Sequence, residues 1–320
     1  MGILKFIVRR VLFGIVTLVI IAFVVFALSQ MLPSDPAQAI LGRGATPEMI
    51  AAKRAELGLD RPKVTQFTSW MNRLFLHGDP GLSFTSRKPI KDVVGDRIVN
   101  SLFLMVLCSL ISIPISVAIG AVAARRRDKA FDQVSSFTTL ALASVPEFVV
   151  GVFLLVLLST NVFHVLPAVA RIRPGEKPWE HLDSLVLPVM TLVLAVVPYV
   201  SRTMRASTIE VLESDYIEMA RLKGLSESTV LWRHAMPNAI GPTLQVIALN
   251  VAYLVAGVIT VEFLFNFKGV GLVLRDSVLG HDMATVQFLA VFVAAIYVVV
   301  NLVADVGTIL VTPRLRTALR

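Results

Sequence analysis

Six long apolar runs, separated by polar segments, dominate the pattern of this chain. They cover residues 11–32, 99–123, 137–163, 184–201, 239–264 and 286–311. Runs of this kind can cross the roughly 30 Å of hydrocarbon in a bilayer as α-helices. They are continuous, whereas the strands of a transmembrane barrel alternate between apolar and polar residues. The pattern therefore predicts an all-α, polytopic membrane protein with six transmembrane helices.

The composition agrees with this class. Hydrophobic residues make up 56% of the chain and charged residues 16%, against about 25% charged in an average soluble protein. The first run could be mistaken for a signal peptide. However, it is long, and its exit at Ser29–Pro33 lacks a small-x-small cleavage site. We expect it to be retained as the first transmembrane helix.

The net charge of +8 could indicate binding of nucleic acid. Lysine and arginine instead gather beside particular runs: at the N-terminus, at Arg125–Lys129, within 202–233 and in the C-terminal tail. Short loops on the cytosolic side of a membrane carry such an excess of positive charge. The distribution therefore predicts that both termini lie inside the cell, and it needs no nucleic-acid partner.

The long polar segment 33–98 falls outside the membrane in this orientation. Thr46 is a predicted N-cap before Pro47, and Gly58 can close the helix that they begin. A second helix is predicted over 64–76. Its apolar side chains recur at helical spacing and are Phe67, Trp70, Met71, Leu74 and Phe75. The segment is either a dock for an extracytoplasmic partner or a packed lid with no partner of its own.

The stretch 202–242 is the one long polar region between two apolar runs late in the chain. It predicts one helix over Glu210–Lys223, a left-handed turn at Gly224, and a second helix that begins at the N-cap Ser226. We expect the second helix to run as far as Pro237. Two short helices that project from the membrane on the cytosolic side could serve as a docking foot, a surface on which a partner protein binds.

Three polar residues lie inside the predicted crossings. Pro146 should kink the third crossing, next to Glu147. A carboxylate at membrane depth by default faces the protein interior or a watery path. Glu147 is therefore a candidate for the translocation path, and the alternative is that it bonds backbone groups freed by the kink. Asn301 and Asp305 share one face of the sixth crossing; they form a polar seam between helices, our preferred interpretation, or part of the path.

The sequence offers no catalytic constellation. It has no G-x-x-x-x-G-K-[ST] loop, no H-E-x-x-H and no C-x-x-C, and no serine has a G-x-S-x-G context. Cys108 is the one cysteine and lies inside an apolar run. His164 and His181 lie at loop edges with no obvious partner. We expect no enzyme activity, no metal site and no cofactor in this chain.

Part of the 202–242 stretch resembles the EAA signature of binding-protein-dependent ABC importer permeases. That signature reads Glu-Ala-Ala, three residues, Gly, nine residues, then Ile-x-Leu-Pro. The matching residues here are Glu218-Met219-Ala220, Gly224 and His234-Ala235-Met236-Pro237. Met219, His234 and Met236 depart from the strict form, but the glutamate, second alanine, glycine and proline keep their spacing.

The sequence outside this signature is similar to the dipeptide/oligopeptide/nickel permease family, and to its B-type subunit in particular. The similar stretches span nearly the whole chain: 57–62, 78–83, 145–151, 214–226, and 301–305 with 313–316. The resemblance implies a type I ABC importer permease (MetI-like) fold. It also implies four parts: residues 1–32 with the first helix, an extracytoplasmic segment 33–98, a five-helix core 99–312 that contains the 202–242 loop, and a cytosolic tail 313–320.

The resemblance implies several partners. These are a second permease of similar fold, two cytosolic ATPase subunits or domains that bind ATP and Mg²⁺, an extracytoplasmic solute-binding protein and membrane lipid. The helix before Gly224 would be the coupling helix seated on an ATPase. By position, the family's coupling residues are Tyr216, Glu218, Ala220, Arg221, Gly224 and Pro237.

Two other classes of function stay open at this point. A proton-driven secondary transporter acting alone would use Glu147 and Asp305, although we find no convincing inverted repeat. A membrane anchor or sensor subunit would not transport at all. For an importer, peptides are the default substrate of the family, and nickel, glutathione, opines or sugars are alternatives.

Overall fold

The structure, a computed structural model, describes residues 3–31, 35–42, 44–160, 162–173 and 175–311. The tail 313–320, and Pro33 at the exit of the first run, lie outside these ranges. Within them the chain is helical, and its one β contact is an isolated bridge between Leu82 and Pro89. The all-α prediction is confirmed.

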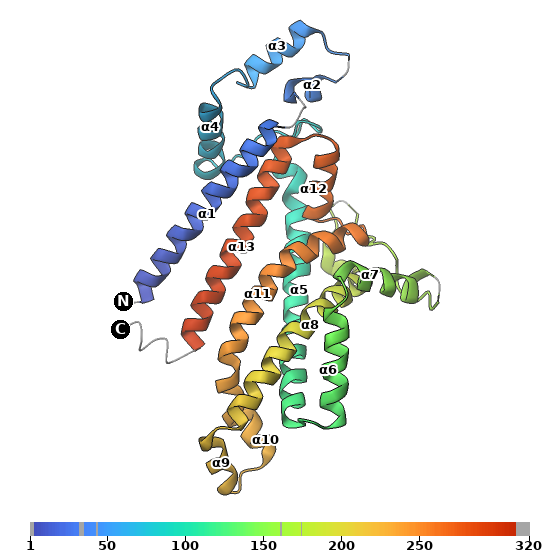
Figure 1. The fold of residues 1–320 in the computed structure, drawn as a ribbon. Helices are drawn as coiled ribbons and strands as arrows, with labels where there is room; N and C mark the ends of the chain where they lie inside the picture. Colours follow the sequence, from blue (N-terminus) through green and yellow to red (C-terminus); the bar gives the residue numbers. More distant parts are fainter. Residues whose placement is uncertain (1–2, 32–34, 43, 161, 174, 312–320) are drawn as a thin grey trace. The chain divides into compact units, whose positions relative to one another are not determined.

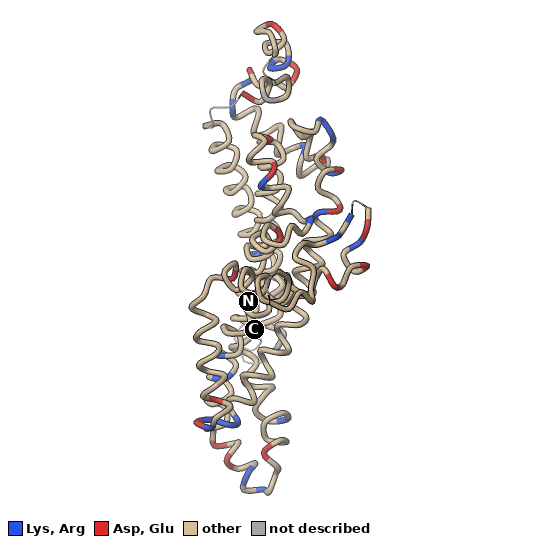
Figure 2. Tube along the Cα trace, turned by 90° about the vertical axis from the view of Figure 1, so that its right-hand side faces the viewer, with Lys and Arg blue, Asp and Glu red and all other residues tan. Residues whose placement is uncertain are grey.

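Five described helices are long and apolar enough to cross a membrane, and a bent pair makes a sixth if it is counted as one span. The long helices are α1 (Ile3–Met31), α5 (Ile90–Arg125), α8 (Leu182–Leu212), α11 (Met236–Leu264) and α13 (Met283–Val311) (Figure 1). They extend beyond the apolar runs because nothing in their polar flanks stops a helix. Charged residues are sparse along their middle parts and gather at their ends (Figure 2).

The third crossing differs from the prediction of one kinked helix over 137–163. It consists of α6 (Ala130–Ala143) and α7 (Glu147–Leu155), bent by 101° at the break between them, with a short π-helix at Val156–Thr160. Pro146 has ψ 143°, which lies outside the helical region, and it serves as the N-cap of α7. The prediction of a kink at Pro146 was correct in place, but the helix breaks there completely.

The described residues form two compact units. One comprises residues of Leu102–Phe267 with those of Met1–Val11 and Val299–Arg320; the other comprises residues of Leu12–Ser101 and Lys268–Val298. In the first unit, α8 packs along α11 and also contacts α6 and α7 (Figure 1). Its core is mainly aliphatic and includes Leu185, Leu192, Val200, Leu254 and Val258. Helix α8 is thus the central element of this unit.

The second unit carries the polar segment between the first two long helices. Its short helices are α2 (Pro36–Leu41), α3 (Pro47–Glu56), α4 (Lys63–Leu76) and α12 (Val270–Leu279). The Thr46 hydroxyl accepts a hydrogen bond from the Met49 N–H, and Gly58 has φ 65°, so both predicted ends of α3 are confirmed. Helices α2 and α12 were not predicted.

One face of α4 packs against the long helices of its own unit. Trp70 forms a cluster with Ala22 and Phe26 of α1 and Val291 of α13, and Phe67, Met71 and Leu74 pack beside it. The Trp70 and Phe26 rings stack with centroids 6.3 Å apart. Phe75 was predicted on this face, but its side chain is 49% exposed. The 64–76 helix is confirmed, and four of its five apolar residues are packed.

Replacing Trp70 with alanine should detach α4 from this cluster. Deleting a packed aromatic side chain costs about 3–5 kcal/mol, and we expect the 33–98 segment to become cleavable by added protease while the rest of the chain stays protected. The matched control is Phe75→Ala on the same helix, which should leave the cleavage rate unchanged. Equal sensitivity in both variants would show that the Trp70 cluster does not hold the segment.

Candidate functional site

Residues 213–235, here called the foot, join α8 to α11. They contain α9 (Asp215–Leu222), α10 (Glu227–Thr229) and a π-helix, η3 (Val230–Ala235) (Figure 1). The sequence predicted a single helix over 210–223, but α8 ends at Leu212 and α9 begins at Asp215. The Ser214 hydroxyl donates a hydrogen bond to the Val211 carbonyl (2.5 Å), so it satisfies the end of α8 rather than capping α9.

The turn between α9 and α10 agrees with the prediction. Gly224 has φ 80°, in the left-handed region, and its N–H donates to the Arg221 carbonyl at 2.9 Å. The Leu225 N–H donates back to the Ala220 carbonyl at 3.3 Å, which completes a glycine-terminated helix end. Ser226 is the N-cap of α10 and accepts from the Thr229 N–H. A side chain with a Cβ would be strained at Gly224.

A small apolar core holds the two arms of the foot together. Ile217 and Ala220 from α9 pack against Val230 and Ala235 from η3, and Val211 and Leu212 at the end of α8 pack beside them. Ile217, Val230 and Ala235 have no exposed surface, and Ala220 is 9% exposed. The close packing explains why a small residue occupies position 220. The foot is therefore a packed unit and can move as one piece.

Polar contacts reinforce this packing. The Arg221 Nε donates to the Glu227 Oε1 at 2.9 Å, and its Nη1 donates to the Leu212 carbonyl at 3.3 Å. That carbonyl is one of those left without an intrahelical partner at the end of α8. Arg221 thus ties both arms of the foot to α8.

Tyr216 joins the foot to the start of α11. Its hydroxyl donates to the His234 carbonyl at 3.4 Å and accepts from the Asn238 Nδ2 at 3.0 Å. The contact with Asn238 was not anticipated, because the two residues are 22 positions apart and neither shows a local signal.

The outer face of the foot is free of such contacts. The Glu218 side chain is exposed and makes no hydrogen bond or ion pair with the described residues. Two apolar side chains beside it are also exposed: Met219 at 54% and Leu222 at 75%. The outer face of the foot thus carries exposed apolar side chains and a carboxylate that no described side chain pairs with.

The second helix does not end at Pro237 as predicted. It continues through η3 into α11, so that Glu227–Leu264 forms one helical rod. The Met236 N–H bonds to the Leu231 carbonyl, five residues back, and this wider turn precedes a proline that has no N–H to donate. Pro237 itself is exposed at the first turn of α11. The foot is thus built directly onto α11 as well as α8.

Glu147 lies in the first turn of α7, at the break in the third crossing. Its Oε2 accepts a hydrogen bond from the Tyr253 hydroxyl of α11 at 3.0 Å. The Tyr199 hydroxyl of α8 donates to the Ala143 carbonyl, at the other side of the break, at 3.4 Å. The Glu147 side chain is half-buried. Its bond is to a neighbouring side chain, not to backbone freed by the break.

Asn301 and Asp305 lie one turn apart on α13 and are half-buried. The Asp305 Oδ2 forms an ion pair with the Arg10 Nη1 of α1 at 3.1 Å. Glu147 and Asp305 therefore have different partners, and no hydrogen bond joins them in the described structure. The structure does not assemble the three path candidates into one cluster.

His181 has a partner that the sequence did not reveal. Its Nε2 lies 2.8 Å from the Glu176 Oε2 in the loop before α8. The Arg173 N–H also donates to this carboxylate, and these bonds lower the pKa of Glu176. The Ser184 N–H donates to the His181 carbonyl at 3.1 Å, but the Ser184 hydroxyl accepts from the Arg171 N–H and is not bonded to the His181 ring, so the pair gives no support to a nucleophilic site.

The chain matches two known protein families, which between them cover most of its length. Residues 116–317 match the family "Binding-protein-dependent transport system inner membrane component". Residues 3–105 match "Binding-prot-dependent transport system membrane comp, N-term". The chain belongs to this family of inner-membrane transport components. The permease is therefore a multi-pass protein of the cytoplasmic membrane, and it works in a transport system that depends on a binding protein.

Curated relatives align with the permease over nearly all of its length. A peptide transport system permease protein of Brucella abortus is 34% identical over 310 residues, which cover 97% of this chain and 98% of the relative. The glutathione transport system permease protein GsiC of Shigella flexneri is 34% identical over 313 residues, 98% and 99% of the two chains. A peptide ABC transporter permease protein of Sinorhizobium fredii is 32% identical over 312 residues.

Proposed function

We propose that the permease is one of two similar transmembrane subunits of an ATP-driven importer, and that the foot is its coupling element. The observation that carries this proposal is the construction of the foot. It is packed within itself, joined directly to α8 and α11, and leaves Glu218, Met219 and Leu222 free on its outer face. Such a unit can move as a rigid body, so that a displacement at its outer face is transmitted to two long helices.

The ATPase that would displace the foot is a separate cytosolic subunit. The permease sequence has no phosphate-binding loop of the G-x-x-x-x-G-K-[ST] type. Two ATPase subunits or domains would bind ATP and Mg²⁺, and their closure would move the foot of each permease subunit. A solute-binding protein would deliver substrate at the outer face. The foot would lie in the cytosol, which agrees with the arginines and lysine at 221–233.

Small peptides are the substrate class that we propose. The relatives from Brucella abortus and Sinorhizobium fredii are named for peptide transport, and GsiC for glutathione transport. Glu147 is the path residue that we favour. It lies at a break in a membrane span, where polar backbone is tolerated only beside protein or water. Asp305 is paired with Arg10, and for it we favour a seam between α1 and α13.

The first test is purification of the permease from its native membrane in mild detergent, followed by identification of the co-purified proteins. We expect an ATPase, a second permease of similar size and a solute-binding protein. Recovery of the permease alone, together with proton-driven transport after reconstitution in the absence of ATP, would contradict the proposal. That outcome would favour a secondary transporter that uses Glu147 and Asp305.

The same purification tests the outer face of the foot. Leu222→Asp places a charge on the most exposed apolar side chain of α9 and should lower recovery of the ATPase about tenfold or more, as for a central interface residue. The second permease should still be recovered. The matched control is Leu279→Asp on α12, where the side chain is 67% exposed; ATPase recovery should be unchanged. Equal recovery in both variants would show that this face of the foot is not the docking surface.

A further inference from the structure

A bidentate ion pair in the first unit lies outside the foot and outside the path candidates. The Asp132 carboxylate of α6 accepts two hydrogen bonds from the Arg205 guanidinium of α8, from Nε at 2.5 Å and from Nη2 at 2.7 Å. The Asp132 side chain is 4% exposed and that of Arg205 is 30% exposed. The Asp128 N–H also donates to the Asp132 Oδ2 at 3.0 Å. The carboxylate is therefore fixed from both sides.

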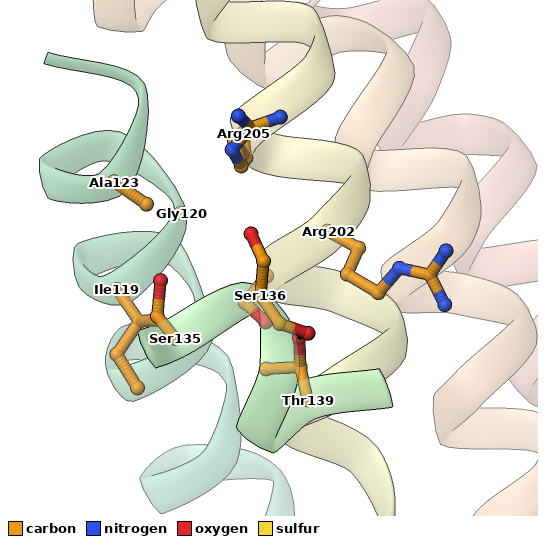
Figure 3. A pocket seen from close by; sticks show the side chains of 9 residues that line it. Ile119, Gly120, Ala123, Ser135, Ser136, Thr139, Arg202 and Arg205 are labelled. Carbon is orange, nitrogen blue, oxygen red and sulfur yellow. Dashed lines mark hydrogen bonds between the residues drawn. The ribbon is translucent and has the colours of Figure 1, made fainter. Parts of the chain in front are cut away.

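Few buried side chains hold α6 against its neighbours, although the Tyr199 hydroxyl of α8 also donates to the Ala143 carbonyl at the end of α6. Asp132 and Thr139 are the two buried residues of this helix, and both are polar. The apolar side chains Val134, Phe137 and Leu140 are exposed, at 65%, 75% and 57%. Between α6, α5 and α8 lies a small open recess lined by Ser135, Ser136 and Thr139, with Gly120 and Arg205 opposite (Figure 3). The ion pair fixes the direction and distance between α6 and α8 beside this loosely filled, hydroxyl-lined recess.

Helices α8 and α5 approach each other closely beside the same recess. A Cβ at Gly120 of α5 would lie 2.5 Å from the Ser201 carbonyl oxygen and 2.7 Å from the Met204 Cβ. The two backbones are therefore in close contact there. Helix α8 contacts α5 through this packing. It contacts α6 through the Asp132–Arg205 ion pair and, at the end of α6, through the Tyr199–Ala143 hydrogen bond.

A second ion pair joins the same elements nearer the foot. Arg127, in the turn before α6, pairs with Glu213, the residue that follows α8 and precedes α9. Both side chains are at least half exposed, and a pair of this kind contributes little to stability by itself. Its position matters more than its strength, because Glu213 is where movement of the foot enters α8.

We propose that the Asp132–Arg205 pair, here called the pin, makes α6 follow α8 when the foot moves. Helix α6 leads directly to the break at Ser144–Pro146 and to Glu147 on α7. Through the pin, a displacement of α8 reaches the Glu147 end of the third crossing by a route that does not use α11. Asp132 and Arg205 are positioning residues, since they act through α6 and need not touch substrate. This inference rests on the proposed function, because it assigns a second effect to movement of the foot, namely movement of α6 in the third crossing.

The chemistry of the pair suits this task. A bidentate guanidinium–carboxylate pair fixes direction as well as distance, and lysine cannot reproduce it. A buried pair adds little net stability compared with apolar residues, and its best-attested use is to fix one arrangement among several. An apolar contact between α6 and α8 would permit sliding, whereas the pin selects one register.

The experiment uses the whole importer, purified and reconstituted in vesicles with its binding protein and a peptide substrate. Uptake and ATP hydrolysis are measured in parallel for Arg205→Lys and Asp132→Asn, and again for Asp132→Glu. We expect the first two variants to assemble with the partner subunits and to hydrolyse ATP. Their uptake per ATP should fall about tenfold, the order of coupling carried by a single contact. Asp132→Glu keeps the charge and should restore part of the ratio.

The matched control is Arg202→Gln, one turn away on α8. Arg202 is exposed, points away from Ser135 and Ser136 (Figure 3), and has no hydrogen bond or ion pair with the described residues. Its uptake per ATP should equal that of the unaltered importer. An unchanged ratio in Arg205→Lys and Asp132→Asn would overturn the inference. So would loss of assembly in both, because the pair would then serve folding alone.

Failure of the proposed function would look different. In that case the unaltered permease would show no ATP-dependent uptake and would co-purify with no ATPase. The effect of the pin is read only as a ratio between variants of an importer that works.

Discussion

Replacing Gly224 with proline is expected to abolish substrate uptake while the permease stays inserted and keeps its second permease partner. Gly224 has φ 80° and donates its N–H to the Arg221 carbonyl. Proline holds φ near −65° and has no N–H, so the turn between α9 and α10 cannot form. A mismatch of this kind costs about 3 kcal/mol or more, enough to lower the population of the native foot more than a hundredfold. Uptake into membrane vesicles, with the amount of inserted permease measured in the same vesicles, checks the result.

Gly224→Asn is the matched control for this variant. Asparagine enters the left-handed region more readily than other residues with a Cβ, and nothing lies within 4 Å of the position that its Cβ would occupy. We therefore expect Gly224→Asn to keep most of the uptake. Normal uptake by Gly224→Pro would show that the geometry of the foot is not used in coupling.

Replacing Glu147 with glutamine should reduce uptake about tenfold and leave assembly intact. The substitution keeps the size of the side chain and removes its charge, and a hydrogen bond to a charged group contributes about 1.5–3 kcal/mol. If Glu147 lines a watery path, as its place at the break in the third crossing suggests, the substitution removes a charged contact with the passing substrate. The measurement is initial uptake at several substrate concentrations, together with the yield of assembled importer.

Tyr253→Phe distinguishes the effect of the Glu147 charge from the effect of its hydrogen bond with Tyr253. It removes the donor to Glu147 and leaves the carboxylate in place. We expect a smaller loss of uptake than in Glu147→Gln. Wild-type uptake by Glu147→Gln, combined with a reduced yield of importer, would instead assign Glu147 to holding α7 against α11.

The local features of the foot could be read from the sequence because they depend on neighbouring residues. The left-handed turn at Gly224 and the N-cap at Ser226 were predicted and are confirmed. The same holds for the start of α3 at Thr46 and Pro47 and for the helix over 64–76. In each case one side chain or one backbone angle decides the conformation, and that information lies within a few residues.

The break in the third crossing could only be partly predicted. Proline occurs at Pro114, Pro188, Pro198 and Pro242 inside helices that continue, whereas the chain turns by 101° near Pro146. The difference lies in distant partners. Tyr199 bonds the Ala143 carbonyl on one side of the break, and Tyr253 bonds Glu147 on the other. These contacts satisfy polar groups that an unsupported break would leave in an apolar surrounding.

Long-range polar pairs were likewise invisible in the sequence. Asp132 and Arg205 are 73 residues apart, and both look like ordinary charges beside an apolar run. Tyr216 and Asn238, or Arg10 and Asp305, are no more conspicuous. Pairing of this kind is set by which helix faces meet, and the hydrophobic pattern of nearly uniform apolar runs does not specify those faces.

The sequence by itself determined the membrane class, the helices, the family resemblance and the turn of the foot. Continuous apolar length, charge asymmetry, glycine and proline are local properties that act wherever the chain folds. The tertiary structure decided that the third crossing is broken, that α8 is the central helix of its unit, and that a buried ion pair joins α6 to it. Those features depend on contacts between residues far apart in the chain, and such contacts exist only after the helices have packed.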